Sequence, residues 1–120
     1  MALALRDYSG TITGVEMNPA AREYALAHKV VDIATDDLRA GVADADTVIL
    51  AAPVRVIIDL ITNRIGSYLR SNTLLVDIGS TKRDICDAMG RLPIGIQAIG
   101  GHPMTGKESS GIESSEATLF

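Results

Sequence analysis

One glycine-rich stretch holds the side chain that the sequence marks most clearly for chemistry. It reads GGHPMTGKESSG from Gly100 to Gly111 and contains His102, one of two histidines in this 120-residue chain. An imidazole titrates close to neutral pH, so it can accept and return a proton under ordinary conditions. Because His102 follows a predicted buried strand on a loop, it is a candidate base, and the alternative is a turn histidine with a satisfied ring.

The same stretch comes close to a phosphate-binding loop. Residues 101–107 fit most of the pattern G-x-x-x-x-G-K-[ST], but Glu108 stands where the pattern needs a hydroxyl. That replacement removes a Mg²⁺ ligand and puts a carboxylate beside the phosphates. Such a loop also normally opens its domain, whereas this one lies late in the chain. The sequence therefore disfavours ATP or GTP binding.

The elements that must position His102 alternate between strands and helices. Apolar or β-rich runs predict strands, and spacings of three and four apolar residues predict helices. Five helices are expected. The first ends within MALALRDY, the second begins at Asn18-Pro19, and a short third lies around Leu38. The fourth covers 54–69, and the fifth begins at Thr81. Strands are expected over 11–16, 30–33, 44–53, 73–79 and 95–101.

This order predicts an α/β fold with a Rossmann-like parallel sheet and helices on both of its faces. Aromatic residues make up only 3% of the chain and the net charge is −4, which argues against nucleic-acid binding. No apolar run approaches the roughly 20 residues of a membrane span, so we expect no membrane partner. With a single cysteine and hence no internal disulfide, we expect a cytoplasmic location. The single cysteine, Cys86, is expected to be a small buried residue, and no metal site is expected.

Ligands of parallel sheets bind beyond the carboxyl ends of the strands. There, Glu16 could accept hydrogen bonds from both hydroxyls of an adenosine ribose and repel a 2′-phosphate, which favours NAD over NADP. Ala52 and Pro53 offer a close approach to a flat cofactor, or they form a plain strand-to-helix turn. Ser80 could hold a substrate hydroxyl, or it could cap a helix with Thr81, for which Asp84 would complete a capping box.

Taken together, these segments resemble the nucleotide-binding half of the prephenate and arogenate dehydrogenase family. The matching residues are VILAAPV at 48–54, LLVDIGSTK at 74–82 and IGGHPMTGKESSGIE at 99–113, continued by ATLF at 117–120. The resemblance implies oxidative decarboxylation of prephenate or arogenate with NAD or NADP. It implies that His102 is the catalytic histidine and that Ser80 holds the reacting hydroxyl beside it. It also places Glu108 in the active-site loop, Glu16 on the ribose, and Ala52, Pro53 and Gly79 at the cofactor.

Residues 1–120 depart from the family pattern in extent. A first strand and the glycine fingerprint G-x-G-x-x-G are missing, and so is the helical domain in which the family binds substrate and dimerises. We therefore expect a partial dinucleotide-binding domain with weak NAD affinity, no turnover by itself, and exposed apolar surface that limits its solubility. The alternatives are another NAD-dependent hydroxyacid dehydrogenase of the same fold and a non-catalytic nucleotide-binding or interaction module.

Overall fold

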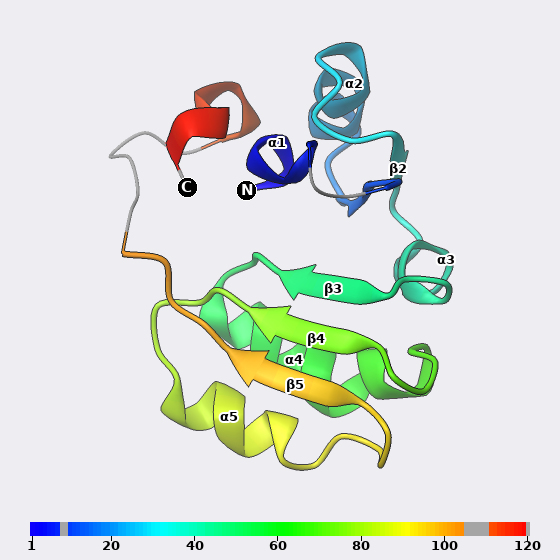
Figure 1. The fold of residues 1–120 in the computed structure, drawn as a ribbon, viewed down its shortest axis with the longest axis vertical. Helices are drawn as coiled ribbons and strands as arrows, with labels where there is room; N and C mark the ends of the chain where they lie inside the picture. Colours follow the sequence, from blue (N-terminus) through cyan, green and yellow to red (C-terminus); the bar gives the residue numbers. More distant parts are fainter. Residues whose placement is uncertain (8–9, 105–110, 120) are drawn as a thin grey trace. The chain divides into compact units, whose positions relative to one another are not determined.

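The computed structural model describes residues 1–7, 10–104 and 111–119. The chain divides into two compact units, which are taken one at a time (Figure 1). Unit 1 comprises Met1–Gly41 with Pro103–Phe120, and unit 2 comprises Val42–His102. No helix among the described residues is long and apolar enough to cross a membrane.

Unit 1 is built around two short parallel strands that pair from Thr13↔Ile33 to Val15↔Thr35. Its small apolar core consists of Ala25, Val30 and Val31, with Ile12 and Ile112 packed against it. The elements are α1 (Ala2–Leu5), β1 (Thr13–Val15), α2 (Pro19–Ala27), β2 (Ile33–Thr35), α3 (Leu38–Val42, which reaches the unit boundary), η2 (Ile112–Ser114) and η3 (Ala117–Leu119).

The start of α2 follows from local sequence, as expected. The Asn18 side chain accepts hydrogen bonds from the backbone N–H groups of Ala20 and Ala21, at 2.9 and 3.4 Å. Pro19 stands in the first turn, where its missing N–H costs nothing. His28, expected to be structural or solvated, is the exposed residue that ends this helix, and its ring stacks on Tyr24.

Unit 2 carries a three-stranded parallel sheet in the order β3-β4-β5. The register aligns Val48 with Leu75 and Ala98, and Leu50 with Asp77 and Gly100. The elements are β3 (Thr47–Leu50), α4 (Val54–Asn63), η1 (Ile65–Ser67), β4 (Leu74–Asp77), α5 (Arg83–Met89) and β5 (Gln97–Gly100). Parallel sheets flanked by helices confirm the predicted Rossmann-like class, although the strands of the described residues form two separate sheets.

The core of unit 2 lies on one face of this sheet. Val48, Leu50 and Leu75 point to that face together with Asp77, since strand side chains alternate with a period of two. The helices α4 and α5 contact each other and supply the buried residues Ile57, Ile61, Ile85, Ala88 and Met89. Ile65 in the 3₁₀ turn η1 is also fully buried. Residues of β5 are exposed, including Ile99.

Two predicted helix limits are wrong. The helix expected over 54–69 ends at Asn63, because Arg64 has φ −134° and a 3₁₀ turn follows. The helix expected from Thr81 begins at Arg83, and no side chain caps it, so the predicted capping box is absent. Tertiary contacts of the preceding loop override the local cap preference there, because the loop is held by Asp77.

Two further expectations are wrong. The strand expected over 30–33 runs instead from Ile33 to Thr35, because Val30 and Val31 turn into the core of unit 1. Cys86, expected to be buried, is exposed on α5. The buried positions of that helix are Ile85, Ala88 and Met89, and residue 86 lies off this apolar stripe.

Candidate functional site

Three predicted site segments follow the carboxyl edge of the unit 2 sheet. Because Leu50, Asp77 and Gly100 are in register, the residues after each strand lie at the same edge. These residues are Ala52 and Pro53 after β3, Gly79 and Ser80 after β4, and His102 after β5. The structure thus brings together, at one edge, five side chains or backbone groups that the sequence proposed for one site.

His102 is tied directly to the loop after β4. Its Nδ1 lies 3.1 Å from the carbonyl oxygen of Gly79. A carbonyl can only accept, so Nδ1 must carry the proton of this hydrogen bond. In the neutral ring, Nε2 is then the unprotonated nitrogen, and the residue as a whole is exposed. The arrangement can take up a proton at a defined atom.

Ser80 lies one residue beyond the carbonyl that binds His102. It is exposed, and its hydroxyl has no hydrogen-bond partner within the described part of the chain. Of the two roles that the sequence left open, capping is excluded, because α5 begins at Arg83 without a side-chain cap. The hydroxyl is available to a ligand.

Gly79 is buried, and its lack of a side chain is a packing requirement. A Cβ added there would lie 3.0 Å from Ile85 Cδ1 and 3.2 Å from Asp77 Oδ1. The loop packs tightly against α4 and α5, so a side chain at position 79 would require Ile57 and Ile85 to shift. This packing fixes the carbonyl that receives the His102 ring.

The Asp77–Lys82 ion pair is a further component of the site, which the sequence pattern did not predict. Asp77 is completely buried, and its Oδ1 accepts from Lys82 Nζ and from the backbone N–H of Gly79, the latter at 2.8 Å. The available signal was an acid inside the apolar strand TLLVDIG, because buried carboxylates almost always have a partner.

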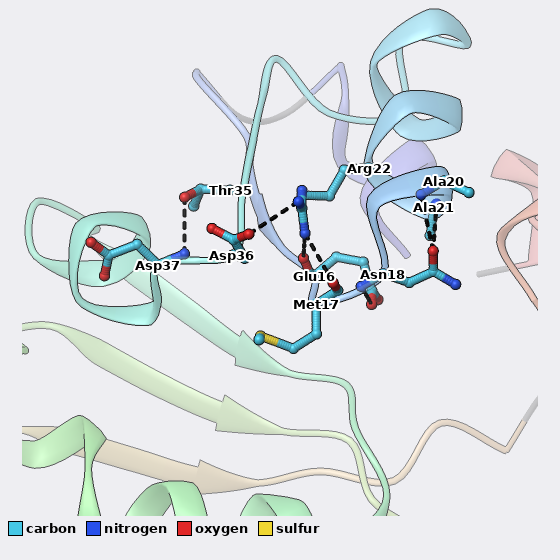
Figure 2. Close-up of polar contacts among 9 residues, drawn as sticks. All are labelled: Glu16, Met17, Asn18, Ala20, Ala21, Arg22, Thr35, Asp36 and Asp37. Atoms are coloured by element: carbon cyan, nitrogen blue, oxygen red, sulfur yellow. Dashed lines mark hydrogen bonds and ion pairs between the residues drawn. The ribbon is translucent and has the colours of Figure 1, made fainter.

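Glu16 lies in unit 1, at the carboxyl end of β1 (Figure 2). Its backbone N–H donates to Thr35 O at 2.9 Å, which continues the pairing with β2. Its Oε1 accepts from the backbone N–H of Asn18 at 2.8 Å, so the carboxylate is fixed against the start of α2. The residue is exposed, which leaves the second carboxylate oxygen accessible to a ligand.

Arg22 holds the same end of β1 together. Its Nη1 donates to the carbonyls of Glu16 at 2.7 Å and Met17 at 3.0 Å, while Nη2 pairs with Asp36 at 3.0 Å (Figure 2). The sequence analysis did not single out this arginine, and its distance from Asp36 in sequence left no local signal. Glu108, by contrast, lies outside the described residues.

The chain matches the family "Prephenate dehydrogenase, nucleotide-binding domain" over residues 1–120. The chain belongs to this family. The family resemblance inferred from the GGHPMTG and DIGSTK segments is therefore confirmed, and the match covers the whole sequence.

Relatives within the prephenate dehydrogenase family are considerably longer. The prephenate dehydrogenase of Bacillus subtilis is 34% identical over 110 residues, which cover 91% of this chain and 30% of that enzyme. The structure of prephenate dehydrogenase from A. aeolicus "in complex with hydroxyphenyl propionate and NAD+" is 28% identical with a TM-score of 0.82, over 98% of this chain and 42% of that one. The structure of Synechocystis arogenate dehydrogenase is 29% identical with a TM-score of 0.87, and the match covers 99% of this chain and 42% of that one.

Proposed function

We propose that this chain supplies the NAD-binding part of a dehydrogenase that oxidatively decarboxylates prephenate or arogenate, a reaction of tyrosine biosynthesis. One observation carries the proposal: His102 is held by the Gly79 carbonyl at the carboxyl edge of a parallel sheet, with Nε2 free to act as a base. The A. aeolicus relative, determined with NAD+ and hydroxyphenyl propionate, supports the choice of ligands.

Each unit by itself has strand ends that suit one part of a dinucleotide. Glu16 presents a fixed, exposed carboxylate to hydrogen-bond an adenosine ribose, and Ala52 and Pro53 add no bulky side chain at the edge of unit 2. When bound, NAD supplies the hydride acceptor for this chemistry. The work left to the chain is binding, orientation and removal of a proton.

The chain's own groups then account for the proton. A substrate carbon that bears a hydroxyl loses a hydride, so positive charge develops there unless the hydroxyl proton is removed. His102 Nε2 would accept that proton, and the imidazolium would keep its Nδ1–H bond to Gly79 O. The Ser80 hydroxyl would orient the reacting hydroxyl from the neighbouring segment. Loss of CO₂ forms the aromatic ring and makes the reaction downhill.

The choice of NAD over NADP has support in the charges around Glu16. A 2′-phosphate would face the Glu16 carboxylate, and the nearby guanidinium of Arg22 is already engaged by Asp36 and two carbonyls. Like-charge repulsion from Glu16 disfavours the phosphate, because the Arg22 guanidinium is already engaged. We expect Asp36→Ala to free Arg22 and raise relative NADP affinity, whereas Glu23→Ala, which removes an exposed acid without a bond to Arg22 among the described residues, serves as the control. Fluorescence titration with both cofactors measures the ratio, and an unchanged ratio in Asp36→Ala would contradict this account.

The remaining expectations concern the whole enzyme. We infer that residues 1–120 form part of a dinucleotide-binding domain, and that substrate carboxylates are held by a helical, dimer-forming domain outside these residues. The supporting fact is that the chain spans only 30% of the B. subtilis relative. A homodimeric cytoplasmic enzyme with small-molecule partners is the corresponding proposal for the complete protein, with Glu108 in its active-site loop.

A chimera tests the activity. In it, this chain replaces the matching segment of the B. subtilis enzyme, and NADH formation is followed with prephenate and with arogenate. We expect His102→Asn to lower turnover by roughly 10²–10⁴-fold, the usual contribution of a general base, while NAD affinity changes little. His28→Asn is the matched control and should retain turnover. A His102→Asn chimera as active as its parent would refute the proposal.

A further inference from the structure

The buried carboxylate of Asp77 is the least expected group near the candidate site. It lies in β4 with no exposed surface, next to the segment that carries Gly79 and Ser80. Its Oδ1 binds Lys82 Nζ and Gly79 N–H, and its backbone carbonyl accepts from Gly101 N–H at 2.9 Å. One residue thus contacts both segments that frame His102.

Lys82 also links the segment after β4 to the segment after β5. Besides the ion pair with Asp77, its Nζ donates to the carbonyl of Gly101 at 2.5 Å. Gly101 immediately precedes His102, and Gly79 provides the carbonyl that binds the His102 ring. The ammonium therefore fixes the His102 backbone relative to the carbonyl that its side chain must reach.

Gly100 shows how closely this pair approaches β5. A Cβ at position 100 would lie 3.3 Å from Asp77 Oδ2 and 3.4 Å from Lys82 Cδ. Oδ2 itself is buried and has no hydrogen-bond partner among the described residues. Burying a carboxylate with one oxygen unsatisfied is unfavourable, so stability alone is a weak reason for an acid here. Pre-organisation of the neighbouring base is a reason that fits the contacts.

We propose that Asp77 and Lys82 are positioning residues that hold His102 in its Nδ1–H tautomer, leaving Nε2 as the base. The pair acts through the backbone: it sets the distance between Gly79 O and the residue before His102. This inference rests on the proposed function for its purpose, since a fixed tautomer matters only if Nε2 takes a proton. Its physical content, the tautomer and its dependence on the pair, stands independently of any substrate.

The tautomer can be measured on the chain as it is. Two-bond ¹H–¹⁵N spectra of the ¹⁵N-labelled protein, at about pH 8 where an imidazole is largely neutral, report which ring nitrogen carries the proton. With only two histidines, assignment requires one substitution, and His28 serves as the internal control. Its Nδ1 also faces a carbonyl, that of Tyr24 at 3.0 Å, but without any ion pair. We expect His102 to show a protonated Nδ1 and an unprotonated Nε2.

Variants of the pair then test the cause. Lys82→Met keeps the aliphatic stem but removes the bond to Gly101 O, and we expect both His102 nitrogens to move to the averaged shifts of exchanging tautomers. The double variant Asp77→Asn/Lys82→Met leaves no unpaired buried charge, so it keeps the test available where Lys82→Met does not fold. We expect the same loss of the fixed His102 tautomer in the double variant, with His28 unchanged in both.

The outcomes separate this inference from the proposed function. A parent protein whose His102 carries its proton on Nε2, or a folded variant that keeps the parent's tautomer, overturns the positioning role. Loss of the tautomer in the variants supports it. A chimera inactive with both substrates would count against the proposed function and would leave the tautomer measurement intact.

Discussion

Gly41 offers the sharpest test of the packing in unit 1. A Cβ added at this position would lie 2.3 Å from Val15 Cγ2 and 3.3 Å from Thr35 Cγ2. Carbon atoms pack favourably at roughly 3.5–4.0 Å, so Gly41→Ala must shift either the Val15 side chain or α3. Val15 immediately precedes Glu16, so the same displacement reaches the candidate ribose site.

The expected magnitude combines two opposing effects. Alanine in place of glycine inside a helix is worth about 1 kcal/mol in favour of folding. Overpacking usually costs about 1–3 kcal/mol, and Val15, with 37% of its surface exposed, can move in part. We expect Gly41→Ala to lower the free energy of unfolding by about 1 kcal/mol net, and Tm by roughly 3–8 °C for a chain of this size.

Urea and thermal unfolding followed by circular dichroism provide the assay, arranged as a double-mutant cycle. Val15→Ala removes the methyl group that the new Cβ would meet, so Val15→Ala/Gly41→Ala should be more stable than the sum of the single changes by about 1 kcal/mol. Gly90→Ala is the matched control, because its Cβ would meet only backbone oxygens at 3.6 Å in a helical conformation. A Gly41→Ala protein as stable as its parent, or additive single changes, would refute the reasoning.

Two further predictions concern stability. Hydrogen bonding from the Ile12 N–H, together with the Arg6 side chain, lowers the pKa of Asp32 below its usual 3.8. The ionised carboxylate therefore stabilises the folded state above about pH 3.8, and this contribution is lost as the pH falls through the folded-state pKa. Asp32→Asn should therefore be less stable than the parent at neutral pH, with the difference vanishing in acid titrations monitored by circular dichroism, and a constant difference down to pH 2 would contradict it. Leu75→Ala, at a fully buried site in the central strand, should cost about 3 kcal/mol in urea unfolding, whereas Ile99→Ala, 54% exposed, should cost less than about 1 kcal/mol, and equal costs would show that the core is misplaced.

Local sequence patterns predict much of the fold. The apolar runs around Val48 and Leu75 predicted two strands that the structure contains, and Asn18-Pro19 predicted the start of α2. These signals are short-range, because a cap needs only the next two or three residues and a buried strand needs only an apolar run. The candidate base, His102, was likewise recognisable from its own loop.

Other features depended on partners distant in sequence. The predicted helix through residue 69 stops at Asn63, and the turn after it brings Gly66 against Pro93: a Cβ there would lie 3.0 Å from Pro93 Cδ. The helix expected at Thr81 begins later, because the preceding loop is held by Asp77 and Lys82. Neither limit could be computed from helix propensity, which tertiary packing commonly overrides.

The sequence by itself determined the order of strands and helices and the parallel class, and it named His102 as the candidate for proton transfer, because each of these follows from side chains close together in the chain. Only the tertiary structure decided that Nδ1 of His102 meets the Gly79 carbonyl and that Lys82 joins Asp77 to Gly101. The His102–Gly79 contact joins residues 23 positions apart, and the Lys82–Gly101 contact joins residues 19 positions apart. Hydrogen bonds and ion pairs act only over a few ångströms. The fold must therefore bring the groups together before their chemistry is defined.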